Sequence, residues 1–457
     1  MTDLTQGSLQ RHLWVMALPM MIGMFVQSLY FFVDLYFVSG LGAEAVAAVS
    51  AGGNLMLLIM ALTQMLNVGC VALIARYTGA RQYDDANQVF QQSMLMGAAL
   101  ALLTLLLGFA GSHYYIQLLS SDPKVQQQAS AFLTAYLPGL ALMFLSTAIA
   151  AALRAVGVVK PTMQVQLVTV LLNILLAPIL IAGWGTGYPL GVMGAGLASS
   201  ISVLVGVLLL WRYFLRSDHS VLQTPKSWRL NSKVWRQIAA IGLPAGGEFA
   251  LIFLFTAFVY WVIQDFGTAT QAAFGIGNRI LQAITMPALA LSFALPAIVG
   301  QNFGAGYADR VRQSFRLGLI QMALVMFGLF IVCQALAHPL VALFSADPLV
   351  LQEGELFLRI ISLNCLSVVL VLSCSGMFQG LGNTWPSLLS STFRIVAFVL
   401  PVLWLSKTAD FSPATVWYCS AASVMLQGLL SFYLLRRQLR RSLNGLLPKE
   451  AANTLIP

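Results

Sequence analysis

One carboxylate stands alone in the first long apolar stretch of the chain. Asp34 lies inside the 28-residue run from Leu13 to Gly40, which exceeds the roughly 20 residues that a helix needs to span a bilayer. Helical spacing places Tyr30 one turn before it and Gln27 two turns before it. An ionised aspartate in hydrocarbon costs at least about 2.5–3.5 kcal/mol, so its presence indicates a functional site. The alternative is a structural aspartate that hydrogen-bonds to neighbouring helices.

Three further charges lie inside apolar stretches, and all of them belong to the second half of the chain: Glu248, Arg279 and Arg394. They are either a mutually compensated structural set or a second functional site. Asp34 has no such partner in its own half, because Arg154 is expected near the opposite face of the membrane. An unpaired carboxylate in low dielectric favours its protonated form, and a modest change in hydration then releases the proton. We therefore expect Asp34 to couple an ion.

The elements that must position these groups are membrane helices. Of the 457 residues, 59% are apolar and only 9% are charged, against about 25% charged in soluble domains. Apolar runs separated by turn residues and charges predict twelve transmembrane helices, and hence an all-α polytopic membrane protein. Their expected ranges are 12–38, 45–75, 88–111, 127–153, 162–184, 190–212, 236–263, 269–299, 314–338, 352–379, 388–406 and 414–435.

The basic residues indicate how the chain is oriented. Of 24 Lys and Arg residues, three fall on one side of these helices (Lys124, Arg359 and Lys407), two lie within helices and the remaining nineteen lie at the termini and the loops of the other side. This bias predicts a protein of the inner membrane with both termini in the cytoplasm. It also explains the net charge of +9 without a nucleic-acid partner. The histidines and cysteines are scattered, so we expect no metal site.

A constant offset of 225 residues relates the two halves of the sequence. It aligns four groups of landmarks, which are Leu18-Pro19 with Leu243-Pro244; Gly42, Ala47, Ala48 and Gly52 with Gly267, Ala272, Ala273 and Gly277; Gly79-Ala80, Asp84 and Phe90 with Gly304-Ala305, Asp309 and Phe315; and Gly157 and Pro161 with Gly382 and Pro386. We expect a six-helix lobe over 1–212, a cytoplasmic linker over 213–235, a second lobe over 236–437 and a basic cytoplasmic tail over 438–457. Six helices per repeat place both lobes in the same direction, related by a pseudo-two-fold axis along the membrane normal.

Prolines and polar side chains in the helices suggest a pathway between the lobes. Pro19 and Pro244 interrupt the first helix of each lobe and are candidate bending points, although a static packing kink is an equal alternative. Met-rich surfaces suit varied apolar ligands, but they also serve as core packing. The candidates for the lining of a substrate cavity are Gln27, Met20, Met24, Gln271 and Asn278.

Several functional classes are excluded by missing motifs. The chain has no GxxxxGK[ST] stretch, and the glycines at 183–187 lack the strand–helix context of a dinucleotide site. We see no set of nucleophile, acid and base. The sequence therefore indicates neither an enzyme nor a bound cofactor.

The pattern resembles the multidrug and toxic compound extrusion (MATE) family. The resemblance rests on ALPMMIGMFVQSLYFFVDLYFVSGLGAEAVAAVS, with its helix-1 proline and aspartate, on the paired Gly-Ala loops and on LLNILLAPILI with Asn173. It implies two six-helix lobes in a V shape and export of cationic or amphipathic compounds driven by H⁺ or Na⁺. By position it assigns Asp34 and Asn173 to the coupling site and matches Ser199 to a hydroxyl on the sixth helix. Tyr30, one turn before Asp34, is added as a neutral helper from its spacing. Ala177 stands where many members carry a second aspartate. The tenth predicted helix also lacks the acid that sodium-coupled members carry there, and both departures favour the DinF-type branch.

The leading hypothesis is thus a monomeric exporter of amphipathic drugs that acts in antiport with H⁺ rather than Na⁺. Its partners are small molecules and membrane lipid. A flippase for lipid-linked oligosaccharides shares the architecture, and two intramembrane arginines in one lobe keep that alternative open. A major facilitator is disfavoured, because the loop after the second helix lacks Gly-x-x-x-Asp-Arg.

Overall fold

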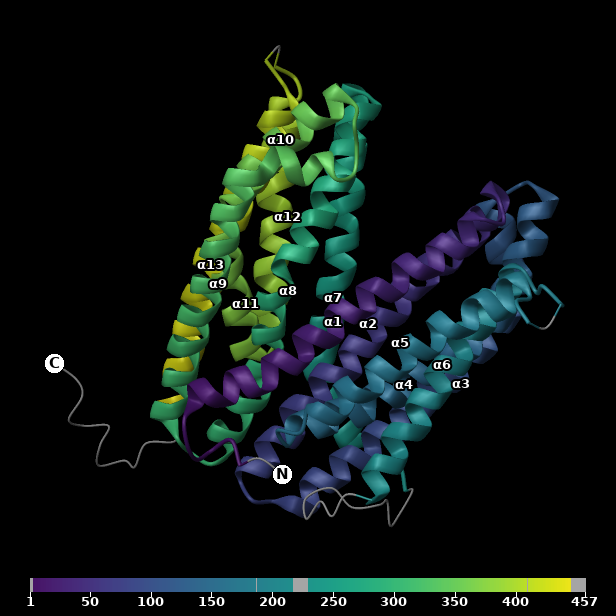
Figure 1. Cartoon of the computed structure of the whole chain (residues 1–457). Helices are drawn as coiled ribbons and strands as arrows, with labels where there is room; N and C mark the ends of the chain where they lie inside the picture. Colours follow the sequence, from purple (N-terminus) through teal and green to yellow (C-terminus); the bar gives the residue numbers. More distant parts are fainter. Residues whose placement is uncertain (1–2, 186, 217–228, 409, 445–457) are drawn as a thin grey trace. The chain divides into compact units, whose positions relative to one another are not determined.

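The chain folds into long helices that are joined by short loops (Figure 1). The structure, a computed structural model, describes residues 3–185, 187–216, 229–408 and 410–444, and only the backbone at 29–35, 43, 51–52, 54, 119 and 444. Most of the predicted linker and most of the predicted tail therefore lie outside the described residues. The first seven helices are α1 (Leu9–Ser39), α2 (Ala43–Gly79), α3 (Tyr83–Leu119), α4 (Pro123–Ala155), α5 (Lys160–Ala182), α6 (Val192–Arg216) and α7 (Ser232–Ile263).

The second half of the chain repeats this order, except that its fourth span is broken into two helices. After the short 3-10 helix η1 (Gln264–Phe266) follow α8 (Thr268–Gly304), α9 (Ala308–Ala342), α10 (Pro348–Ser362), α11 (Cys365–Gly380), α12 (Trp385–Leu405) and α13 (Pro413–Asn444). Among the described residues, eleven helices are long and apolar enough to cross a membrane, and the pair α10–α11, bent by 52°, supplies a twelfth span. The prediction of twelve spans in an all-helical membrane protein is confirmed.

The prediction of one continuous helix over 352–379 was wrong. The helix breaks between Ser362 and Cys365, where the amides of Leu363 and Asn364 donate to carbonyls three residues earlier, Ile360 and Ile361, at 3.2 and 2.9 Å. Such tighter bonds end an α-helix. The break has no proline or glycine to mark it in the sequence.

Local backbone features confirm the 225-residue repeat. Asp122 and Asp347 cap α4 and α10 by accepting from the amides two residues later, at 2.8 and 2.9 Å, each followed by a proline at the first helical position. Positive φ angles recur at the same offset. The pairs are Gly42 (107°) with Gly267 (95°), Arg81 (58°) with Gly306 (79°), and Gly157 (77°) with Gly382 (74°).

The helices form two compact units whose boundaries cut through α1 and α7. One unit contains residues 18–246 and the other residues 4–17 together with 247–457. The first part of α1 therefore packs with the second half of the chain, and the first part of α7 packs with the first half. The boundaries lie close to Pro19 and Pro244, which are both buried within their helices. The structure leaves the helix-bending role of these prolines and the V-shaped arrangement as proposals.

Small residues set how closely helices approach in the first unit. A Cβ on Gly242 of α7 would lie 2.0 Å from the carbonyl oxygen of Met65 in α2, and a Cβ on Gly69 would lie 2.5 Å from that of Ile238. Between α4 and α6, the hydroxyl of Ser200 donates to the carbonyl of Ala135 and accepts from the amide of Gly139. Close backbone contact of this kind is how membrane helices gain packing energy.

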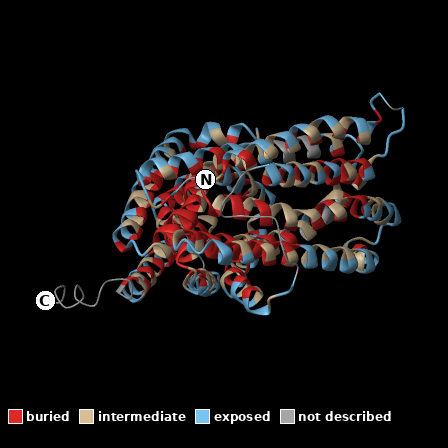
Figure 2. Cartoon of the chain, turned by 90° about the horizontal axis from the view of Figure 1, so that it is seen from below, coloured by how far each residue is buried: buried red, intermediate tan, exposed pale blue. Residues whose placement is uncertain are grey.

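Burial separates an inner from an outer side of the helices. Figure 2 shows buried residues gathered where helices face one another, with exposed residues along the outer faces. The exposed side chains include large apolar ones, such as Leu106 (60% exposed) and Leu107 (64%) in α3. Apolar surface of this extent needs a hydrocarbon environment. The chain is an integral membrane protein.

Candidate functional sites

A fully buried asparagine lies in the middle of α5. Asn173 is 0% exposed, and neither its amide oxygen nor its amide nitrogen has a hydrogen-bond partner among the described residues. One turn later, Ala177 belongs to a buried cluster that also contains Val38 of α1. An orphan amide is costly in an apolar interior, so it is retained where it serves a ligand, an ion or water.

The other predicted members of the coupling site are described unequally. The side chains of Asp34 and Tyr30 lie outside the described residues. Ser199 on α6 is buried, at 4% exposure, and already has an interaction partner. The structure therefore establishes only the burial of Asn173 and Ser199.

Part of α1 contacts α5 through side-chain amides. Gln27 accepts a hydrogen bond from Gln166; Gln27 is exposed and Gln166 is half-buried. Met20 and Met24, one turn apart, are half-buried. These residues lie in the first unit, and whether they line a substrate cavity stays a prediction.

Glu248 of α7 has no ionic partner in the described part of the chain. Its atom Oε1 is buried without a hydrogen bond, and its carboxyl group interacts with the hydroxyl of Ser387 on α12. Among the described residues the salt bridges join Lys124 to Glu44, Arg312 to Asp309, and Glu355 to His338 and Arg359. A Glu248–Arg279 or Glu248–Arg394 ion pair is therefore not formed, so the expected structural compensation does not apply.

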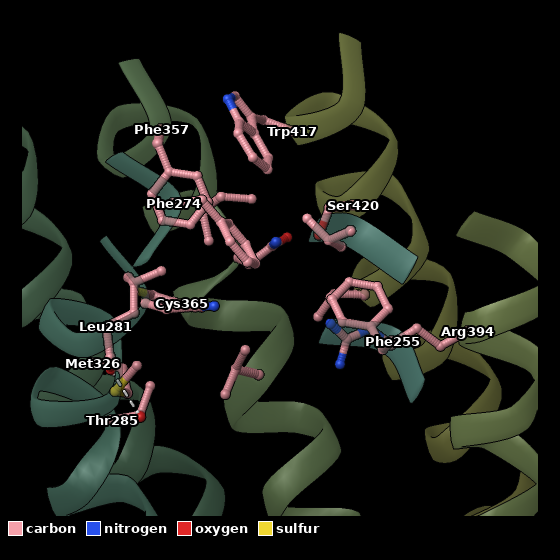
Figure 3. A pocket seen from close by; sticks show the side chains of 16 residues that line it. Phe255, Phe274, Leu281, Thr285, Met326, Phe357, Cys365, Arg394, Trp417 and Ser420 are labelled. Atoms are coloured by element: carbon pink, nitrogen blue, oxygen red, sulfur yellow. Dashed lines mark hydrogen bonds between the residues drawn. The ribbon is translucent and has the colours of Figure 1, made fainter. Parts of the chain in front are cut away.

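The two intramembrane arginines have different surroundings. Arg279 and Asn278 are exposed on α8, and Gln271, about two turns earlier on the same helix, is half-buried. Arg394 of α12 instead lines a pocket of about 190 Å³ inside the second unit, together with Asn278 (Figure 3). The structure thus separates the three charges of the second half into three environments.

Aromatic residues at this pocket could not be located from the sequence. Phe274 stacks on Trp417 with ring centroids 5.5 Å apart, and Phe357 meets Trp417 edge-on at 4.8 Å. The three rings come from α8, α10 and α13. A Cβ on Gly277 would lie 2.2 Å from the ring of Phe357, so this glycine makes the room for it. Gly277 was already one of the repeated landmarks, and it was the available sign of a large neighbour.

The arrangement can bind and exchange small molecules rather than transform them. It offers one orphan amide in the first unit, one carboxylate beside a hydroxyl in the second, and a guanidinium in an aromatic pocket. None of these groups is placed as a nucleophile beside a general base.

A known family model matches both halves of the chain. The MatE family model matches residues 19–179 and 244–405. The two matched segments begin 225 residues apart, at the offset found in the sequence.

Curated relatives and solved structures match over almost the whole chain. The multidrug export protein MepA of Staphylococcus aureus (strain NCTC 8325 / PS 47) is 25% identical over 431 residues, 93% of each chain. The probable multidrug resistance protein YoeA of Bacillus subtilis (strain 168) is 26% identical over 439 residues, 94% of each. The crystal structure of the Vibrio cholerae MATE transporter VcmN in its bent form has a TM-score of 0.89 at 23% identity, covering 96% of this chain and 99% of that one. A MOP superfamily transporter from Pyrococcus furiosus also gives 0.89 at 23% identity, with 96% and 98% coverage.

Proposed function

The chain belongs to the MatE family of membrane transporters, and on that premise we propose that it exports amphipathic and cationic compounds in antiport with protons. It is a transporter rather than an enzyme. The relatives MepA and YoeA are named as multidrug export and resistance proteins, which supports a range of drug-like substrates for this chain. The DinF-type branch has no specific support from these relatives.

The observation that carries the proposal is the buried, unpartnered amide of Asn173. It lies one turn before Ala177, and the cluster around Ala177 includes Val38. Sequence spacing puts Asp34 one turn before Val38 in α1, and α1 and α5 run in the same direction because four spans separate their starts. Asp34 and Asn173 therefore occupy matching levels of their helices, which supports their joint action on one ion, with Tyr30 and Ser199 as neutral helpers.

A proton fits this donor set better than sodium. Asp34 is the one carboxylate in the apolar spans of the first half, and Ala177 occupies the place of a second. Sodium exchanges its water shell for several oxygen ligands, whereas a proton needs one carboxylate and a change of hydration. Glu248 with Ser387 is the alternative anchor for sodium, in the second unit.

We predict that Asp34→Asn inserts and folds normally but abolishes uphill export. The test uses proteoliposomes in which either a pH gradient or a sodium gradient drives export of ethidium or norfloxacin. The control Asp84→Asn removes an exposed carboxylate at the start of α3 and should transport normally. Export by Asp34→Asn at the normal rate would remove Asp34 from the mechanism. Export that requires sodium and ignores the pH gradient would refute the proton assignment.

A second candidate, flipping of lipid-linked oligosaccharides, is favoured by the guanidinium of Arg394 inside a pocket. A flippase of this kind needs cationic groups for pyrophosphate. The same proteoliposomes, loaded with a fluorescent lipid-linked sugar, distinguish the two functions. Movement of the lipid without drug export would replace the first proposal by the second.

The remaining features of the proposal concern topology. We propose a monomer with both termini in the cytoplasm, lobes at 1–212 and 236–437, and bending at Pro19 and Pro244. The nearness of the two unit boundaries to these prolines supports the bending points.

A further inference from the structure

The pocket of the second unit is lined by residues of the seven helices α7 to α13 and by Asn364 at the break between α10 and α11. Its volume of about 190 Å³ exceeds the roughly 150 Å³ of an apolar cavity that accepts benzene. It therefore has room for one aromatic ring with a small substituent. The break matters here, because it places Asn364 at the pocket wall.

One end of the pocket carries a positive charge. Arg394 is the tenth residue of the 21-residue helix α12, so it lies at the middle of a membrane span. Figure 3 shows its guanidinium beside the ring of Phe255. The guanidinium carbon lies 4.3 Å from the centroid of that ring. The atom Nε is buried and has no hydrogen-bond acceptor among the described residues.

None of the described residues that line the pocket is acidic. The carboxylate that comes closest along the facing helix is Glu248, which interacts with Ser387. Seven residues separate Glu248 from Phe255 and also Ser387 from Arg394, which is about 10 Å along each helix. The backbone levels of Glu248 and Arg394 are therefore about two turns apart, and the described residues form no salt bridge between them.

A guanidinium at membrane depth without a counter-charge is retained where a ligand supplies that charge. A carboxylate accepts two parallel hydrogen bonds from an arginine, and the side-chain amide of Asn364, 6% exposed, adds a further donor at the wall. The other end of the pocket is the aromatic cluster of Phe274, Phe357 and Trp417. Rings of this kind offer stacking and edge contacts to a flat apolar group.

We propose that this pocket is a binding site for aromatic carboxylates, with the acid group on Arg394 and the ring toward Trp417. The site would admit anionic and zwitterionic aromatic compounds in addition to the cations of the proposed function. Binding at this site depends on the second unit alone and does not require the coupling role of Asp34.

The test measures binding by ligand-observed NMR on the purified full-length protein in neutral detergent. Benzoate, benzamide and benzylamine share one ring and differ in charge. We expect benzoate to bind at least ten-fold more tightly than benzamide, and benzylamine to bind no better than benzamide. Equal affinity for benzoate and benzamide would overturn the proposal.

Variants then assign the charge to its residue. Arg394→Gln should remove the preference for benzoate, and Arg394→Lys should weaken benzoate about ten-fold, because lysine keeps the charge but not the planar fork. The control Arg279→Gln removes an exposed arginine of the same unit that does not line the pocket, and it should bind benzoate normally. Unchanged benzoate binding in Arg394→Gln, or equal loss in Arg279→Gln, would refute the site. If Arg394→Gln does not fold, the lysine variant decides, and undiminished benzoate affinity in it counts against the proposal.

A lipid headgroup is the other source of an anion on this arginine. The titration is therefore repeated in nanodiscs of phosphatidylcholine and of phosphatidylglycerol. Equal benzoate binding in both supports a site for aromatic acids. Loss of benzoate binding in phosphatidylglycerol alone would show that the pocket holds a lipid phosphate instead, and the proposal would be wrong.

Discussion

Buried polar atoms without partners are rare in folded proteins, because each one loses its hydration without gaining a hydrogen bond. Asn173, Glu248 and Arg394 each have at least one such atom among the described residues. All three were singled out from the sequence as polar groups in apolar stretches. The structure adds that Glu248 and Arg394 do not pair with each other in the described part of the chain, so an ion pair between them does not explain their presence.

This separation changes the expectation for Glu248. Were it paired, Glu248→Gln would strand an arginine at a cost of about 3–5 kcal/mol. Because Glu248 forms no ion pair with the described residues, we predict an unchanged melting temperature for Glu248→Gln, with transport lost if the carboxylate binds a cation. The comparison variant is Glu355→Gln, which breaks contacts of 2.9 Å to Arg359 and 3.2 Å to His338 and should lower the melting temperature slightly. A large drop in Glu248→Gln alone would show that a structural partner exists.

Arg81 occupies a backbone position that suits glycine. Its φ of 58° lies in the left-handed region, and the equivalent position of the second half is Gly306, with φ of 79°. A residue with a Cβ loses about 1–2 kcal/mol of folding free energy in this conformation. Glycine avoids this strain, but its greater conformational freedom in the unfolded chain offsets part of the gain. We predict that Arg81→Gly stabilises the protein by about 0.5–1 kcal/mol. Melting curves in detergent check this, with Arg81→Ala as the control, and equal behaviour of both variants would contradict the backbone explanation.

At the scale of elements, the interrupted span α10–α11 positions the pocket. A continuous helix would bond the amides of Leu363 and Asn364 four residues back and carry Asn364 around with the helix surface. The tighter bonds at the break instead leave the side chain of Asn364 at the pocket wall, beside Cys365. The irregular backbone is tolerated because it faces a cavity within the protein rather than lipid.

Close helix contacts define a second feature of the elements. Gly242 lets α7 touch the backbone of α2, where a Cβ would lie 2.0 Å from the carbonyl oxygen of Met65. We predict that Gly242→Ala destabilises the protein by about 1–3 kcal/mol, because the helices must separate to admit one methyl group. Gly328→Ala in α9 is the matched control. It meets nothing within 4 Å and should be neutral or stabilising by up to about 1 kcal/mol through helix propensity. Equal melting temperatures of the two variants would show that α7 and α2 are not tightly packed.

At the scale of the whole chain, the sequence predicted the twelve membrane spans, because long apolar runs bounded by charges leave little choice in a bilayer. The predicted ends were less accurate, since the helices predicted at 88–111 and 414–435 extend to Leu119 and Asn444. The 225-residue repeat followed from landmarks such as Pro19 and Pro244. The pocket was beyond reach, since Phe274, Phe357 and Trp417 are far apart in sequence and meet only through packing. The break at Leu363 was missed because no breaker residue marks it.

The exchange of segments between the two units was also not predicted. The segment before α1 is held by the second unit, where the amide of Leu4 donates to Gln301 at 3.1 Å and its carbonyl accepts from Asn302 at 3.1 Å. The segment before α7 is held similarly by the first unit. Gln92 donates to the carbonyl of Arg229 and accepts from the amide of Asn231, both at 2.9 Å. Leu4 and Arg229 are again 225 residues apart.

Arg310 adds hydrogen bonds from a charged group to the segment before α1. It donates to the carbonyls of Gly7 at 3.2 Å and Leu4 at 3.4 Å, and to Asn302 at 2.8 Å. Hydrogen bonds from a charged group contribute about 1.5–3 kcal/mol, so Arg310→Ala should raise hydrogen exchange of residues 4–12 by about 10- to 100-fold. Exchange in α3 and α4 of the first unit should not change. The control Arg312→Ala removes an exposed arginine whose ion pair among the described residues is with Asp309, at 3.3 Å, and it should leave the N-terminal segment protected. If the two variants exchange alike, the N-terminal segment is held by the burial of Leu4 and Leu13 alone, and the polar anchor contributes nothing.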